Sequence, residues 1–298
     1  MKRKPYEKYK KWLSKNTESL AGKTVAITGS TGGLGREISR YLAYLGASLI
    51  FVDRSYSRSL EHKDALCAEF PETEVKLISA DLSDFDSVKR AGELLAAERV
   101  DFFIHNAGAY SIPRKICDTG YDNVFQINFL SPYYLTRILM DGIKDRGGKT
   151  IIVGSIAHNY SKTDSSDVDF KARKKASLVY GNAKRFLMYS ALSLTKDESS
   201  PFVSVTHPGI TFTNITSHYP KLIFALIKYP MKIIFMRRDK AALSILRGIF
   251  DKTERYEWIG PRIFNVWGLP NKKTLKSAEA SEIEYISKEA ERIYQSLK

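Results

Sequence analysis

Short apolar runs alternate with longer amphipathic stretches along most of the chain after residue 23. This alternation is typical of βαβ units, in which helices connect parallel strands. Six runs are predicted to be strands: Thr24–Thr28, Ser48–Asp53, Val75–Ser79, Val100–His105, Lys149–Val153 and Phe202–His207. Four longer stretches are predicted to be helices: Leu34–Leu45, Ser83–Ala97, Tyr121–Lys144 and Tyr180–Thr195. The pattern therefore predicts an α/β protein with one doubly wound domain around a mostly parallel central sheet.

Four segments depart from this alternation without dividing residues 1–298 into further domains. Residues 1–22 form a basic N-terminal extension, and residues 158–177 are polar enough to be a surface insertion. Residues 215–238 are apolar and basic and are broken by prolines, so we expect a small helical cap over the carboxyl edge of the sheet. Residues 274–298 carry apolar side chains at helical spacing, which predicts an amphipathic closing helix.

The charge of the chain is strongly positive, with 47 basic and 33 acidic residues and a formal net charge of +14. Such an excess suits nucleic acid, an anionic membrane or a phosphorylated ligand and does not discriminate among them. No zinc finger, RNA-binding aromatic signature or helix-turn-helix pattern accompanies it, so we expect no nucleic-acid partner. Apolar and basic residues are mixed within 215–238, so this segment could rest on an anionic bilayer, although its apolar residues could equally pack in the core.

The two cysteines and the hydropathy of the chain indicate whether to expect a metal site, a disulfide or a membrane-spanning helix. Cys67 and Cys117 lie far apart, with no CxxC pair and no histidine at metal-ligand spacing, so we expect neither a disulfide framework nor a metal site. No apolar run follows the basic N-terminus, and no stretch approaches the roughly 18 apolar residues of a membrane-spanning helix. We therefore expect a cytoplasmic protein that is at most peripheral to a membrane.

A glycine-rich turn, TGSTGGLG at residues 28–35, joins the first predicted strand to the first predicted helix. Backbone amides at such a helix N-terminus can face a pyrophosphate, and the missing side chains allow it to approach, although a tight turn also serves packing. Asp53 ends the second predicted strand, where a carboxylate would accept hydrogen bonds from the adenosine ribose. The two features together predict a dinucleotide site.

Tyr180 and Lys184 lie four residues apart on a predicted helix and therefore on the same helical face. A phenol with an ordinary pKa of about 10 is a poor base at neutral pH, so a neighbouring cation that favours phenolate would help Tyr180 to exchange a proton. A Tyr and Lys pair at this spacing is common on exposed helices and does not assign catalysis alone. Beside a dinucleotide site, the pair suggests hydride transfer.

Several short motifs occur in an order that resembles the classical short-chain dehydrogenases/reductases, over about residues 22–215. They are TGSTGGLG, Asp81-Leu82, Asn106-Ala107-Gly108, Asn128, Ser155, Tyr180xxxLys184 and Pro208-Gly209. The turn also fits the TGxxGxxG spacing of the extended, epimerase-like branch, but Asn-Ala-Gly and the chain length resemble the classical branch. Ser155 precedes Tyr180 by 25 residues, and this long gap, with Ser-Ile-Ala-His and His-Pro-Gly, resembles the retinol dehydrogenase-like subgroup.

The resemblance implies a Rossmann-type NAD(P)-dependent oxidoreductase that interconverts an alcohol and a carbonyl compound, with a lipophilic small molecule as the expected substrate and a homo-oligomer as the expected assembly. Tyr180 would exchange the proton, Lys184 would hold the nicotinamide ribose, Ser155 would polarise the substrate oxygen, and Asn128 would hold a relay water. The cofactor-binding residues that it implies are Gly29, Ser30, Gly33, Leu34, Gly35, Asp53, Arg54, Asp81, Leu82, Asn106, Ala107, Gly108, Tyr180, Lys184, Pro208, Gly209, Thr211 and Thr213.

Each assignment has a plainer alternative that the sequence leaves open. Asn128 could be a helix-packing amide, Ser155 a strand-end turn residue, and Pro208-Gly209 a simple turn. Asp81 could cap the helix that begins near Ser83 instead of lying beside the adenine. The histidines at 105, 158 and 207 are scattered, so we expect structural roles for them.

The preferred dinucleotide depends on two neighbouring residues. Asp53 would repel the 2′-phosphate of NADP, whereas Arg54 could pair with it. No basic residue lies inside the turn between Gly29 and Gly35, and Arg36 comes only after it, so the sequence favours NAD. A nucleotide-sensing or scaffold protein without turnover is the alternative function, and the intact catalytic set argues against it.

Overall fold

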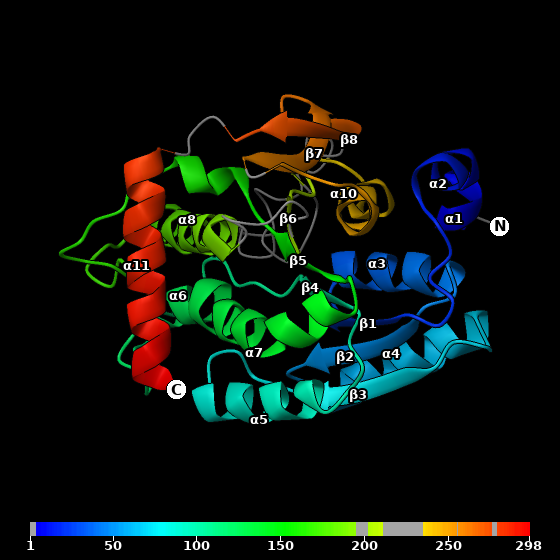
Figure 1. The fold of residues 1–298 in the computed structure, drawn as a ribbon, viewed down its shortest axis with the longest axis horizontal. Coiled ribbons are helices and arrows are strands. Elements are labelled where there is room, and N and C mark those ends of the chain that lie inside the picture. Colours follow the sequence, from blue (N-terminus) through cyan, green and yellow to red (C-terminus); the bar gives the residue numbers. More distant parts are fainter. Residues whose placement is uncertain (1–3, 195–201, 211–234, 255, 276–278) are drawn as a thin grey trace, which may run out of the picture.

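The computed structural model describes residues 4–194, 202–210, 235–254, 256–275 and 279–298. At its centre lies an eight-stranded sheet with the order β3-β2-β1-β4-β5-β6-β7-β8 (Figure 1). Strands β1 to β7 are parallel, and β8 runs antiparallel to β7. The strands are β1 Thr24–Thr28, β2 Ser48–Asp53, β3 Val75–Ser79, β4 Phe102–His105, β5 Lys149–Val153, β6 Val203–Thr206, β7 Glu257–Ile263 and β8 Trp267–Thr274. The predicted α/β fold with a mostly parallel sheet is confirmed.

Helices connect the strands and cover both faces of the sheet (Figure 1). Within the described residues they are α1 Pro5–Lys8, α2 Lys10–Asn16, α3 Gly33–Tyr44, α4 Tyr56–Glu69, α5 Phe85–Ala96, α6 Asn123–Phe125, the π-helix η1 Gln126–Leu130, α7 Ser131–Asp145, the 3₁₀-helix η2 Ile156–Asn159, α8 Ala176–Leu194, α10 Arg238–Phe250 and α11 Ala280–Leu297. No helix in this described part of the chain is long and apolar enough to cross a membrane.

Side chains that alternate along the strands fill two cores, one on each face of the sheet. On β1, Val25 and Ile27 pack into one core and Ala26 into the other. The first core includes residues of α3, α4 and α10, together with Leu13 of α2. The second includes residues of α5, α7, α8 and α11. Both faces of the sheet are therefore buried, as the near-continuous apolar strands require.

The predicted helix over residues 121–144 is divided into α6, η1 and α7. It begins at Asn123 and not at Tyr121, because the Asp122 carboxylate accepts a hydrogen bond from the Val124 amide at 2.9 Å and caps the helix. The later π-helical turn places an extra residue in this segment, which hydrophobic periodicity does not reveal.

Several elements lie outside the sequence predictions. The basic extension 1–22 contains α1 and α2, anchored by the buried side chain of Leu13. The strands β7 and β8 were not predicted. The closing helix was expected to begin at residue 274, but Thr274 is the last residue of β8 and the helix α11 begins at Ala280.

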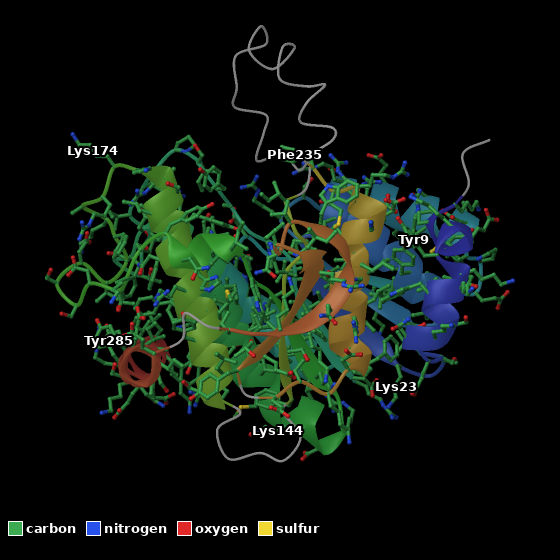
Figure 2. All side chains as sticks on the ribbon, turned by 90° about the horizontal axis from the view of Figure 1, so that it is seen from above. Tyr9, Lys23, Lys144, Lys174, Phe235 and Tyr285 are labelled. Atoms are coloured by element: carbon green, nitrogen blue, oxygen red, sulfur yellow. The ribbon has the colours of Figure 1, made fainter. Side chains whose placement is uncertain are left out.

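Segments 158–177 and 215–238 differ in how far the structure describes them. Segment 158–177 is largely exposed, with Lys174 projecting outward (Figure 2), but His158, Asp169 and Phe170 are buried, so it is not purely a surface insertion. The predicted cap 215–238 lies mostly outside the described residues.

Candidate active site

The glycine-rich turn connects β1 to α3 and leaves no room for side chains at two positions. Gly29 has a φ of +71°, in the left-handed region that favours glycine. A Cβ atom on Gly35 would lie 2.2 Å from the Gly29 carbonyl oxygen, and one on Gly29 would lie 2.9 Å from the Ala107 Cα atom. The turn is therefore a tight cradle at the N-terminus of α3, a position where backbone amides can face an anion.

The end of β4 holds this turn in place. The Asn106 side-chain amide donates hydrogen bonds to the carbonyl oxygens of Thr28, at 3.1 Å, and Gly29, at 2.9 Å. The Ala107 amide donates to the Thr28 hydroxyl at 3.0 Å. The Asn-Ala-Gly motif and the glycine turn thus form one unit across adjacent strands, at the point where the strand order reverses.

Asp53 ends β2 beneath the turn and is buried. One carboxylate oxygen accepts hydrogen bonds from the Ser30 hydroxyl at 2.5 Å and from the Ser59 hydroxyl at 2.8 Å. Arg54, the next residue, is exposed. Asp53 therefore braces the glycine turn from within the protein, a role that the sequence did not predict.

The remaining residues expected to bind the cofactor lie at the ends of β3 and β6. Asp81 accepts hydrogen bonds from the Ser83 amide and hydroxyl, whereas Asp84 is the N-cap of α5, so Asp81 does not cap that helix. The buried residue Leu82 follows Asp81. Pro208 and Gly209 follow β6, and Gly209 has a φ of +79°. Thr211 and Thr213 lie outside the described residues.

Tyr180 and Ser155 lie near each other, and the Ser155 side chain is close enough to lower the pKa of the Tyr180 phenol. Ser155 follows β5 and is the N-cap of η2, whereas Tyr180 lies in the first turns of α8. The two elements pack closely because Gly181 has no side chain: a Cβ atom there would lie 2.4 Å from the Ala157 carbonyl oxygen. Burial raises the pKa of Tyr180 to about 12, while the nearby Ser155 side chain acts in the opposite direction.

Lys184 lies one helical turn after Tyr180 and is buried. Its Nζ atom donates a hydrogen bond to the Val153 carbonyl oxygen at 3.0 Å and lies 5.9 Å from the centre of the Tyr180 ring. Burial lowers the pKa of Lys184 to about 8. Burial therefore outweighs the influences that lower the pKa of Tyr180 in this arrangement, and the role expected of Lys184 stays a prediction.

Asn128 lies in the π-helix η1 and faces the same region. Its side-chain amide donates to the carbonyl oxygens of Ala109 and Val124, each at 2.8 Å, and its oxygen accepts from the Ala109 amide at 3.2 Å. A Cβ atom on Gly108 would lie 2.8 Å from the Asn128 Oδ1 atom and 3.6 Å from the Lys184 Nζ atom. Gly108 therefore lies between the amide and the ammonium group, and Asn128 is held in a fixed orientation.

Sequence reasoning missed two residues beside this site. The Tyr110 ring meets the Tyr180 ring edge to face, with 5.3 Å between their centres. The guanidinium group of Arg238 lies against Gly33, where a Cβ atom would come within 2.5 Å of it. Both contacts join segments distant in sequence, so no local pattern indicates them. Among the described residues, no group of three metal-ligating side chains lies together.

The carboxyl ends of β1, β4 and β5 thus bring the glycine turn and a cluster of Tyr180, Ser155, Lys184 and Asn128 to one edge of the sheet. A family model described as short chain dehydrogenase matches residues 23–221. The chain belongs to this family and is an NAD(P)-dependent short-chain dehydrogenase/reductase.

Individual relatives agree with this assignment. Retinol dehydrogenase 14 of Mus musculus is 30% identical over 214 residues, which cover 67% of this chain and 64% of that protein. The short-chain dehydrogenase TIC 32 A, chloroplastic, of Brassica napus is 29% identical over 222 residues, which cover 68% of each protein. L-sorbose reductase of Gluconobacter frateurii, solved with NADPH and L-sorbose, has a TM-score of 0.62 at 20% identity and covers 78% of this chain and 91% of that one. The NAD preference expected from Asp53 finds no support in these proteins.

Proposed function

We propose that this protein interconverts an alcohol and a carbonyl compound by hydride transfer, with Tyr180 as the general acid/base. The observation that carries the proposal is the cluster at the start of α8, where the Ser155 side chain is close enough to lower the pKa of Tyr180 and the buried Lys184 Nζ atom lies 5.9 Å from the Tyr180 ring centre. A nucleotide-sensing or scaffold protein has no need of a paired phenol and hydroxyl beside a cofactor cradle.

Bound NAD(P)H would supply the hydride that adds to the carbonyl carbon. The Ser155 hydroxyl would donate a hydrogen bond to the carbonyl oxygen, and Tyr180 would transfer its proton to that oxygen as the charge develops. A pKa of about 12 keeps Tyr180 protonated at neutral pH, which suits a general acid in the reducing direction. Alcohol oxidation would use the same groups in reverse, with a proton passing to Tyr180.

We infer a lipophilic substrate. The Tyr110 ring meets the Tyr180 ring edge to face, so the reacting group would enter beside an aromatic surface. The similarity to retinol dehydrogenase 14 favours the same class of molecule. Contact with an anionic membrane through 215–238 and a homo-oligomeric assembly stay predictions.

We further infer that the protein accepts NADP(H), with Arg54 beside the 2′-phosphate. Asp53 is buried and already accepts hydrogen bonds from Ser30 and Ser59, whereas Arg54 is exposed at the end of β2. In a fluorescence titration, Arg54→Ala should weaken binding of NADPH and leave binding of NADH unchanged. Equal loss for both cofactors, or no loss for either, would reject this assignment.

Oxidation of NADPH with a panel of aldehydes and ketones tests the proposed reaction. The panel should contain long-chain and polyene aldehydes beside small polar ketones, with absorbance at the nicotinamide band as the readout. We expect turnover with the lipophilic members. Tight cofactor binding without turnover on any carbonyl compound, or on the corresponding alcohols with NADP, would favour the non-catalytic alternative.

A further inference from the structure

Arg238, the first residue of α10, reaches the glycine turn from a distant part of the chain. Helices α10 and α3 pack against each other (Figure 1), and the Arg238 guanidinium group lies over Gly33. A Cβ atom on Gly33 would lie 2.5 Å from the Cζ and Nη1 atoms and 2.6 Å from the Nε atom of Arg238. The flat side of the guanidinium group therefore occupies space that only a glycine leaves open, at the first residue of α3.

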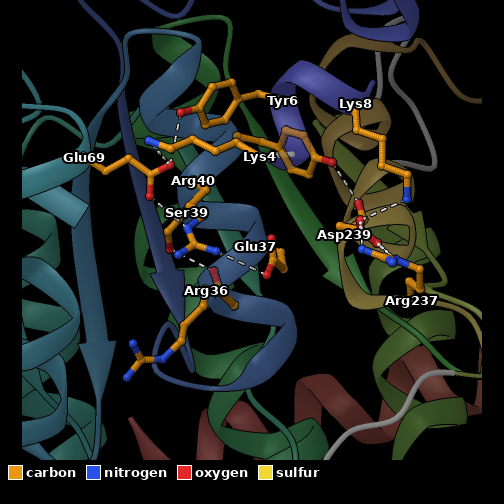
Figure 3. A network of polar contacts seen from close by, with 12 residues as sticks. Lys4, Tyr6, Lys8, Arg36, Glu37, Ser39, Arg40, Glu69, Arg237 and Asp239 are labelled. Carbon is orange, nitrogen blue, oxygen red and sulfur yellow. Dashed lines mark hydrogen bonds and ion pairs between the residues drawn. The ribbon is translucent and has the colours of Figure 1, made fainter. Parts of the chain in front are cut away.

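A network of ion pairs fixes the main chain next to Arg238 (Figure 3). The buried Asp239 carboxylate accepts hydrogen bonds from the Lys8 ammonium group at 3.2 Å and from the Arg237 guanidinium group at 3.0 and 3.1 Å. The Tyr41 hydroxyl of α3 donates to the Asp239 carbonyl oxygen at 3.0 Å. The N-terminus of α10 is thus tied to both α1 and α3, so the base of the Arg238 side chain is held in place.

The charges around Arg238 leave this corner of the molecule positive. Lys8 and Arg237 bind Asp239, and Arg40 forms ion pairs with Glu37 at 3.5 Å and with Glu69 at 3.2 Å, and Glu69 also pairs with Lys4 at 3.3 Å. The positive charge of Arg238 also acts on Glu37 of α3, where it lowers the pKa of the carboxyl group against the larger effect of burial. Five basic side chains, with Lys4 and Arg238 included, therefore face the three carboxylates of Glu37, Glu69 and Asp239 here. The amides at the α3 N-terminus carry a partial positive charge of their own.

We propose that Arg238 binds the pyrophosphate of the dinucleotide cofactor. The N-terminus of α3 supplies amide donors. The Arg238 guanidinium group, which lies against Gly33, adds a full positive charge and paired N–H donors that match phosphate oxygens. Arg238 lies beyond residues 23–221, which match the family model, so the inference concerns a feature of this chain. The side chain would move from the Gly33 surface onto the phosphate oxygens when the cofactor enters.

Binding of ADP, adenosine, NADH and NADPH to the full chain tests this role, with tryptophan fluorescence or calorimetry as the readout. For Arg238→Ala we expect affinity for ADP, NADH and NADPH to fall about ten-fold or more, because a charge-assisted hydrogen bond is lost. Adenosine, which lacks phosphate, should bind both proteins equally. Because NADH and NADPH share the pyrophosphate, both should lose affinity alike, in contrast to Arg54→Ala.

Lys240→Ala is the matched control, since it removes one positive charge from the same turn of α10. The Lys240 ammonium group lies 4.8 Å from the centre of the Trp267 ring, and its loss should leave ADP affinity unchanged. Arg238→Lys, which keeps the charge but not the paired donors, should bind ADP with intermediate affinity and covers the case in which Arg238→Ala does not fold. Unchanged or tighter ADP binding by folded Arg238→Ala would overturn the proposal and leave Arg238 as a partner of Glu37 or as an obstruction of the cradle.

Discussion

Acid should destabilise this protein through its buried histidines. The side chains of His62, His105, His158 and His207 are buried, and burial lowers the pKa of each, to about 3 for His105 and to about 4 for the other three. In the unfolded chain a histidine has a pKa of about 6.5. Between about pH 6.5 and pH 4 the unfolded chain therefore binds more protons than the folded protein, and the free energy of unfolding falls as the pH falls.

The size of the effect follows from these pKa values. Lowering the pH from 7 to 5 should remove about 2 kcal/mol of unfolding free energy for each histidine that stays neutral in the fold. Four such histidines together account for about 7 kcal/mol, comparable with the whole unfolding free energy of about 5–15 kcal/mol of a typical domain. The protein should therefore be near its unfolding transition at pH 5 without denaturant.

Urea unfolding at pH 7, 6 and 5, followed by far-UV circular dichroism, measures this dependence. His62→Phe is the informative variant, because the His62 ring stacks on Phe51 at 4.8 Å between ring centres and its buried Nε2 atom has no hydrogen-bond partner. Phenylalanine keeps the stacked ring and does not titrate, so the loss from pH 7 to pH 5 should shrink by about 2 kcal/mol. The reasoning would be refuted by a parent protein equally stable at pH 7 and pH 5, or by identical pH dependence in parent and variant.

Two further predictions concern the ion pair between α8 and α11 and the glycine-rich turn. Arg185 and Glu282 form a buried ion pair between α8 and α11. Glu282→Gln should therefore lower the free energy of unfolding, measured by urea titration, by about 3 kcal/mol. A loss below about 1 kcal/mol, which is typical of exposed ion pairs, would contradict this. Gly35→Ala should abolish cofactor binding in fluorescence titrations, because its Cβ atom would overlap the Gly29 carbonyl oxygen. Gly32→Ala should bind cofactor normally, because its Cβ atom would lie 3.4 Å from the same oxygen. Normal binding by both variants would show that the turn can adapt.

The strands were predictable because each is a short apolar run that the sheet buries on both faces. Because β1, β4 and β5 are parallel neighbours, their carboxyl ends bring Gly29, Asn106 and Ser155 to one edge of the sheet. What the sequence could not supply is the direction of individual side chains. Asp53 bonds to Ser30 and Ser59 within the fold, which local sequence does not encode.

The site residues that sequence reasoning missed are joined by contacts between distant segments. Arg238 is 205 positions from Gly33 and touches it only because α10 packs against α3. The direction of the pKa shift of Tyr180 likewise depends on burial, which spacing to Lys184 does not reveal. Periodicity predicts elements, and only packing decides which side chains meet.

The role of Tyr180 as the proton donor is tested most directly by turnover of Tyr180→Phe with a carbonyl substrate from the panel. We expect the rate to fall by about 100-fold to 10,000-fold, because the general acid is lost, while NADPH binds with parental affinity. Parallel fluorescence titration separates loss of chemistry from loss of binding. A Tyr180→Phe variant that turns over at the parental rate would contradict the proposed mechanism.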